Sequence, residues 1–120
     1  MSKAGKQRVP DYLDHIREAI SRIQTYVRNM DQASFEADER TQDAVIRNLE
    51  IIGEACNNVS RHYPEFAKHH ADVPWGFAYE MRNALAHGYF TVDLEIVWNT
   101  LQADLPKLAL QIEKLLSAGK

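Results

Sequence analysis

Cysteine is almost absent from this chain: Cys56 is the single one among 120 residues. One thiol can form neither an internal disulfide nor a zinc site of several thiolates, and no HxxxH or CxxC spacing occurs. No stretch approaches the roughly 20 apolar residues that a transmembrane helix needs. The basic first ten residues lack the apolar core of a secretory signal. We therefore expect a cytoplasmic protein with no bound metal or other cofactor and no membrane contact.

A large net charge is also missing, since the formal charge at pH 7 is -3. Lys3, Lys6 and Arg8 carry three of the positive charges, so the remaining residues sit at -3 minus 3, or -6. An acidic body argues against DNA as a partner, because non-specific DNA binding needs broad neutralisation of phosphates. We expect residues 1–9 to form a flexible basic tail and residues 10–118 to form a single domain.

Strand patterns are nearly absent, whereas apolar residues recur at helical spacing in four segments. These segments are residues 11–30, 39–61, 74–87 and 93–116. Short connections between long helices predict an all-α, up-and-down four-helix bundle with short extra helical turns. Apolar residues off the main stripes, such as Ile51, Phe77, Trp98 and Leu116, need cover and favour a homodimer.

Several single residues have predicted structural roles. Phe35 is expected to plug the edge of the core, and Cys56 to be a small core residue. Asp38 or Thr41 is expected to cap the second long helix, and Asp93 the last one. Pro106 lies inside the last helix, where it removes a backbone hydrogen bond and is expected to cause a kink.

The stretch MRNALAHGYF, residues 81–90, places Arg82, His87 and Tyr89 at the predicted end of a helix. At about 100° per residue, Arg82 and His87 point roughly 140° apart. Both side chains can then act on one substrate only if the helix loosens at His87 or if a second subunit brings its own copy. The spacing thus predicts a composite site at a dimer interface.

These residue types suit the cleavage of RNA. The arginine fork can hold two phosphate oxygens, and an imidazole can exchange a proton with a ribose 2′-OH or a leaving 5′-oxygen. DNA lacks the 2′-OH and would not react in this way. A purely structural interpretation also stays open, because Arg and His are common at helix C-termini, where they compensate the helix dipole.

The motif of Arg, four residues, His, any residue and Tyr resembles that of the HEPN superfamily, and closely that of the HepT-like toxins. Three blocks carry the resemblance: RTQDAVIRNLEIIGEACNNVS, VPWGFAYEMRNALAHGYF and VDLEIVWNTLQADLPKL. Together they cover most of the chain, from about residue 9 to residue 117.

The resemblance implies a HEPN-like helical homodimer that acts as a metal-independent endoribonuclease, with its active site between the protomers. Arg82 and His87 match the catalytic pair, and Asn83 matches a supporting polar residue. The implied role is the toxin of a type VII-like toxin–antitoxin system, with RNA, tRNA above all, as its substrate. The implied partner is a minimal nucleotidyltransferase antitoxin that transfers AMP from ATP to Tyr89.

Other interpretations remain open from the sequence. A non-catalytic helical module could bind a nucleotide or a nucleotidyltransferase partner, and a bundle could serve dimerisation alone. Lys68, His69 and His70 form either a basic patch that meets RNA or a solvated loop. Trp75 and Trp98 are expected to be core or dimer contacts rather than platforms for base stacking.

Overall fold

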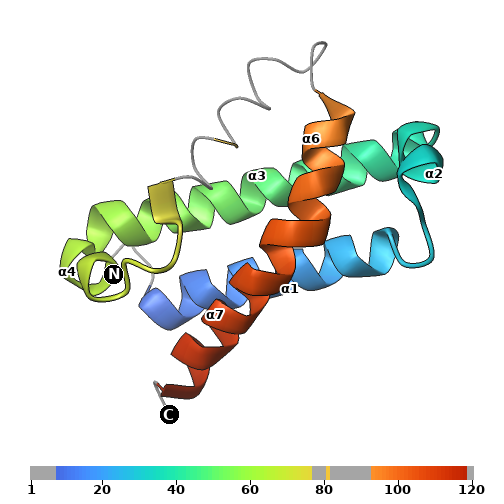
Figure 1. Cartoon of the computed structure of the whole chain (residues 1–120). Helices are drawn as coiled ribbons and strands as arrows, with labels where there is room; N and C mark the ends of the chain where they lie inside the picture. Colours follow the sequence, from blue (N-terminus) through green and yellow to red (C-terminus); the bar gives the residue numbers. More distant parts are fainter. Residues whose placement is uncertain (1–7, 77–80, 82–92, 119–120) are drawn as a thin grey trace.

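The computed structural model describes residues 8–76, residue 81 and residues 93–118 (Figure 1). These residues form helices and connecting turns, without a strand in the described ranges. In chain order the helices are α1 (Val9–Tyr26), α2 (Gln32–Glu36), α3 (Glu39–His62), α4 (Pro64–His69), α6 (Leu94–Asn99), η2 (Thr100–Asp104) and α7 (Leu105–Ala118). The prediction of an all-α chain is thus confirmed for this part of the protein.

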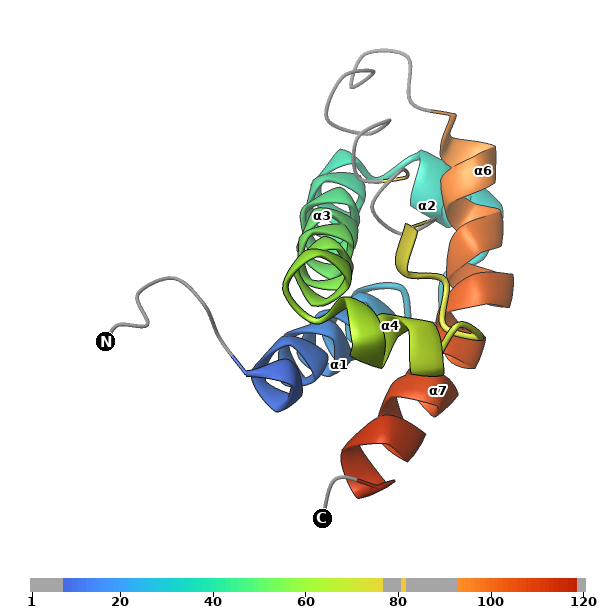
Figure 2. The same cartoon turned by 90° about the vertical axis from the view of Figure 1, so that its left-hand side faces the viewer.

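The helices α1 and α3 lie side by side and run in opposite directions (Figures 1 and 2). The last three elements, α6, η2 and α7, follow one another without a break and form one long C-terminal helix. Its α7 part packs on α1, while α2 bridges α3 and α6. The core therefore lies between α1, α3 and the C-terminal helix.

The predicted apolar stripes are the sides that these helices bury. In α3 the apolar stripe is buried, and Gly53 is buried beside it; the stripe consists of Val45, Leu49, Ile52, Cys56 and Val59. Phe35 is fully buried against Trp98, with ring centroids 5.4 Å apart. The predicted core roles of Phe35, Cys56, Trp75 and Trp98 are confirmed. The largest side chains that are fully buried in the described core are Phe35, Ile16, Ile20, Ile23, Ile112, Val45, Val59 and Cys56.

The first helix ends earlier than its apolar pattern predicted. It stops at Tyr26 rather than at residue 30, and Asn29 adopts the left-handed conformation with φ 67°. Asparagine tolerates this region better than most residues, so the turn stops the helix although Val27 and Met30 still pack against the core. The connector that follows contains the short helix α2, whose N-cap is Asp31.

Asp38 is the N-cap of α3, which confirms one of the two predicted candidates. Its carboxylate accepts a hydrogen bond from the Thr41 N–H at 3.1 Å. One turn further, the Gln42 side chain donates to the carbonyl oxygens of Phe35 and Glu36, at 2.9 and 3.0 Å. These bonds fix the end of α2 on the start of α3 and hold Phe35 in the core.

Asp93 caps the C-terminal helix, as predicted, by accepting hydrogen bonds from the N–H groups of Glu95 and Ile96. Pro106 lies near the middle of this helix, two residues after the end of a π-helical stretch, η2. There the Leu105 N–H donates to the Thr100 carbonyl oxygen, five residues back. A widened turn relieves the clash between a proline ring and the carbonyl four residues before it. The helix therefore accommodates Pro106 by a π turn, and the size of any kink stays a prediction.

The third long helix of the predicted bundle falls mostly outside the described residues. Trp75, Gly76 and Met81 are helical, in agreement with the predicted start near residue 74. Four long helices and a dimer remain predictions. Among the described residues, no helix is long and apolar enough to cross a membrane.

Candidate functional site

The four predicted site residues, Arg82, Asn83, His87 and Tyr89, lie outside the described residues. The structure does describe the framework that surrounds their segment in the sequence. Trp75 and Met81 precede the motif, and Asp93 follows it.

On the N-terminal side, Trp75 fixes the chain to α4. Its side chain is buried, its indole N–H donates to the His70 carbonyl oxygen at 3.1 Å, and its ring lies 6.2 Å from that of Phe66. The Gln111 side chain on α7 donates to the Asp72 carbonyl oxygen at 2.8 Å, which ties the same loop to the C-terminal helix. The chain is thus fixed at Trp75, which precedes the motif in the sequence.

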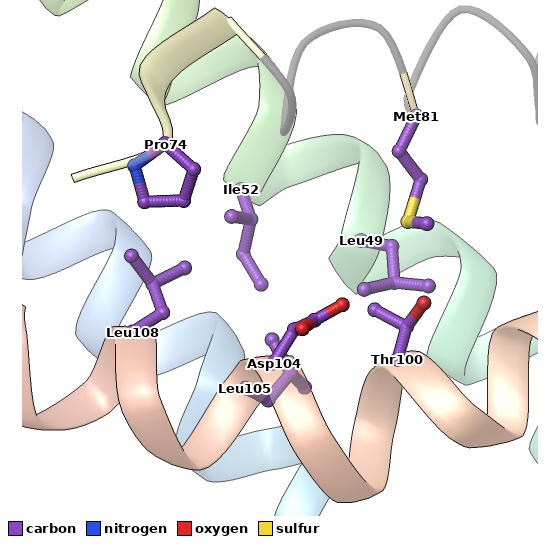
Figure 3. Close-up of a pocket in the computed structure, with 8 residues that line it drawn as sticks. All are labelled: Leu49, Ile52, Pro74, Met81, Thr100, Asp104, Leu105 and Leu108. Atoms are coloured by element: carbon purple, nitrogen blue, oxygen red, sulfur yellow. The ribbon is translucent and has the colours of Figure 1, made fainter. Parts of the chain in front are cut away.

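Met81, the residue directly before Arg82, faces a small apolar pocket between α3 and the C-terminal helix (Figure 3). The volume of this pocket is about 40 Å³. Its other lining residues are Leu49, Ile52, Pro74, Thr100, Asp104, Leu105 and Leu108. Met81 therefore lies beside α3 and the π-helical stretch.

The π-helical stretch contributes two of the polar groups of the pocket, Thr100 and Asp104. Thr100 is buried, and its hydroxyl donates to the Ile96 carbonyl oxygen at 2.9 Å. Asp104 is exposed, and its carboxylate extends into the space between α3 and the C-terminal helix (Figure 3).

The described core also contains a buried thiol, Cys56, and a buried amide, Asn48. Burial raises the pKa of the Cys56 thiol to about 12, so this cysteine stays protonated and is no nucleophile. Asn48 is buried and donates to the Ala44 carbonyl oxygen at 2.9 Å, but its own side-chain oxygen has no partner among the described residues. Asn48 lies three residues after Val45 and four before Ile52, so helical spacing places it beside the buried stripe although its side chain is polar.

No group of three or more potential metal-binding side chains occurs in the described part of the chain. The basic residues Lys68, His69 and His70 do lie together, at the end of α4. Trp75 and Trp98, in contrast, are buried and cannot stack on a nucleic-acid base. Two candidate functional features thus lie in the described part of the chain: the Met81 pocket and the basic C-terminal end of α4.

Comparison with known proteins assigns the chain to a family. The family model for HepT-like ribonucleases matches residues 16–115, which is most of the chain. A "Probable ribonuclease HepT" of Thermococcus cleftensis is 43% identical over 105 residues, which are 88% of this chain and 93% of that protein. A "Putative RNase" of Caldanaerobacter subterraneus subsp. tengcongensis is 35% identical, over 91% of this chain and 95% of that protein.

A third relative combines two activities in its name, "Gamma-glutamylcyclotransferase and putative RNase", from Methanocaldococcus jannaschii. It is 40% identical over 88% of this chain, but the match covers 46% of that longer protein. No solved structure matches the chain. The family match and these relatives, all named as ribonucleases, agree with the family that the sequence resembles. The chain therefore belongs to the HepT-like ribonucleases of the HEPN superfamily.

Proposed function

We propose that this protein is a metal-independent endoribonuclease that acts as the toxin of a type VII-like toxin–antitoxin system. Its site would be formed by Arg82 and His87 in the cleft of a homodimer, with Asn83 in support. The observation that carries the proposal is the complete motif, Arg82–His87–Tyr89, in a chain that belongs to a family of ribonucleases. tRNA is the RNA class that we would test first, and the cytoplasm is where such a substrate is found.

The chemistry needs only the ribose and these side chains. One His87 takes the proton of a ribose 2′-OH, whose oxygen attacks the adjacent phosphorus. The bond from phosphorus to the 5′-oxygen then breaks, and an imidazolium returns a proton to that oxygen. Arg82 donates hydrogen bonds to the phosphate oxygens as negative charge builds up on them. The products are a 2′,3′-cyclic phosphate and a free 5′-hydroxyl.

Tyr89 supplies a way to switch such a site off. A partner nucleotidyltransferase would transfer AMP from ATP to the Tyr89 oxygen and release pyrophosphate. The added phosphodiester would stand two residues from His87, compete with substrate phosphate for Arg82 and fill the cleft with a base. Inhibition would then be covalent and would not require the antitoxin to stay bound.

The decisive experiment is cleavage of total tRNA and of mRNA by the purified, unmodified protein in the presence of EDTA. We expect cleavage with 2′,3′-cyclic phosphate ends, and a loss of about 10²-fold or more in His87→Ala. Arg82→Lys, which keeps the charge but loses the planar fork, should also be severely impaired. Circular dichroism and light scattering would verify that each variant keeps its fold and its oligomeric state.

Cleavage that EDTA abolishes would refute metal independence. Failure of a demonstrably unmodified protein to cleave any RNA would instead favour a non-catalytic helical module that binds a nucleotide or the nucleotidyltransferase. The switch is tested by co-expression with the partner and intact-mass spectrometry. We expect added AMP that disappears in Tyr89→Phe, and inhibition without added mass would contradict the covalent mechanism.

A further inference from the structure

One hydrogen bond joins the loop after α4 to the C-terminal helix. The Gln111 side chain on α7 donates to the Asp72 carbonyl oxygen at 2.8 Å, across 39 positions of the sequence. The bonds that the side chains of Asp38 and Gln42 make, in contrast, join residues at most seven positions apart. The Gln111 bond therefore connects two parts of the fold that are distant in the sequence.

The loop that accepts this bond is held together by its own backbone. The Val73 N–H donates to the His70 carbonyl oxygen at 3.1 Å, and the Trp75 N–H donates to the Val73 carbonyl oxygen at 2.9 Å. The Trp75 indole N–H donates to the same His70 oxygen, and both Val73 and Trp75 are buried. We therefore expect residues 70–75 to move together, so that a shift at Asp72 is passed on to Trp75.

Packing between this loop and the C-terminal helix is incomplete beside the Gln111 bond. A hollow of about 310 Å³ lies there, and its lining residues are Asp72, Pro74, Asp104, Lys107 and Gln111. Asp72 is exposed, so burial does not hold it against the helix. In a close-packed interior many contacts fix a position, whereas beside a hollow each single bond matters more. The Gln111 bond therefore helps to set the distance between the Asp72 backbone and α7.

The same loop precedes Met81, the residue before the motif. Pro74 and Met81 line one apolar pocket together with Leu108 of the C-terminal helix (Figure 3). Trp75 and Met81 are both helical, at the two ends of a short stretch of sequence. Arg82 follows Met81 directly, and the Cα atoms of consecutive residues lie about 3.8 Å apart. A shift of the loop that reaches Met81 is thus passed on to the backbone of Arg82.

We propose that Gln111 is a positioning residue of the ribonuclease site. Through its bond to Asp72 it holds the loop, and with it the start of the motif, at the distance from α7 that the reaction requires. Gln111 itself does not touch the substrate. A displacement of about 1 Å can lower a reaction rate on the order of 10²-fold, so a small shift of the loop is enough. This inference rests on the proposed ribonuclease function and deepens it, because it gives Arg82 a support outside the motif.

The test is cleavage of tRNA, well below the thermal midpoint, by variants of Gln111 that differ in their hydrogen-bond donors. Gln111→Glu keeps the shape of the side chain but has no donor when it is ionised, and Gln111→Met has neither a donor nor a charge. We expect both variants to lower kcat about tenfold and to change KM by less than about twofold. Gln111→Lys restores a donor, so its kcat should stay within about twofold of the wild type.

Gln24→Met, the same substitution at an exposed glutamine on α1, is the matched control and should cleave like the wild type. Hydrogen exchange of the peptide that covers residues 71–76 reports on the loop without any substrate. We expect faster exchange in Gln111→Met and Gln111→Glu than in Gln111→Lys. If Gln111→Met does not fold, the comparison of Gln111→Glu with Gln111→Lys decides alone.

Wild-type kcat in the variants without a donor would overturn the positioning role, even if their thermal midpoints fall, because Gln111 would then serve stability alone. An equal loss of kcat in Gln111→Lys would overturn it as well. Cleavage that is insensitive to Gln111 refutes this inference and leaves the proposed function intact. A wild type that cleaves no RNA refutes the ribonuclease function itself, and the positioning role with it.

Discussion

At the scale of single residues, Asn48 is the buried polar group with an incomplete set of partners. Its amide donates to Ala44, but its oxygen has no partner among the described residues. An unpaired buried acceptor costs about 1–3 kcal/mol. We predict that Asn48→Leu, which keeps the branched shape, leaves the free energy of unfolding unchanged or raises it by about 1 kcal/mol. Urea denaturation followed by circular dichroism would measure this.

Asn48→Ala serves as the control for that measurement, because it removes the polar group and also leaves a cavity, and it should be destabilising. A loss of more than about 2 kcal/mol in Asn48→Leu would contradict the prediction. It would mean that the Asn48 side chain makes a net stabilising contribution to the folded state.

At the scale of elements, Pro106 and the π turn before it form one unit. A proline inside a helix costs about 3 kcal/mol relative to alanine, and the π turn η2 accommodates the ring. We predict that Pro106→Ala raises the free energy of unfolding by about 1 kcal/mol or more and lets η2 relax to α-helix. Denaturant unfolding would give the first quantity, and a crystal structure of the variant the second.

Pro10→Ala is a matched control for Pro106→Ala, since Pro10 lies in the first turn of α1, where proline is well tolerated. Its effect on stability should be small. A destabilised Pro106→Ala would show that the π turn is a packing requirement of the Met81 pocket. In that case the helix would keep its widened turn even without the proline.

The lowered pKa values of two helix-capping carboxylates, Asp31 and Asp38, predict how stability depends on pH. Hydrogen bonds from Ser34 lower the pKa of Asp31 below 3.8, and those from Thr41 lower that of Asp38 likewise. A lowered folded-state pKa adds stability that is present above about pH 3.8 and is lost as the pH falls through the folded-state value. We predict that the thermal midpoint of the wild type exceeds that of Asp38→Asn at neutral pH and approaches it in acid. A gap that stays constant with pH would show that the charge of Asp38 is not what stabilises α3.

The elements that could be predicted from the sequence are those in which local and tertiary preferences agree. The buried sides of α1, α3 and the C-terminal helix follow from helical periodicity, and Asp38 and Asp93 follow from capping chemistry. The early end of α1 could not be predicted, because it depends on the left-handed turn at Asn29 and the apolar pattern continues past it. The π turn could not be predicted from the sequence either, because a proline in a helix can cause either a kink or a widened turn.

At the scale of the whole molecule, the family could be predicted from three blocks of the sequence, and the family match confirms it. The roles of the motif residues stay a prediction. The Met81 pocket, in contrast, combines residues from three segments, at positions 49–52, 74–81 and 100–108, and only folding brings them together. The relative placement of Arg82 and His87 likewise cannot be predicted from their spacing, because on a regular helix the two side chains point apart.

A mixed dimer can decide whether Arg82 and His87 meet between two subunits. Suppose that each site takes Arg82 from one protomer and His87 from the other. Arg82→Ala and His87→Ala are then each inactive alone, but a heterodimer of the two contains one site with both wild-type residues. Random exchange of equal amounts gives heterodimers in about half of the population, so about a quarter of the wild-type RNA cleavage should return. If both residues of a site come from one protomer, neither protomer has a complete pair and no activity returns. Light scattering on the same samples would establish that the protein is a dimer, and a monomeric active protein would contradict the composite site outright.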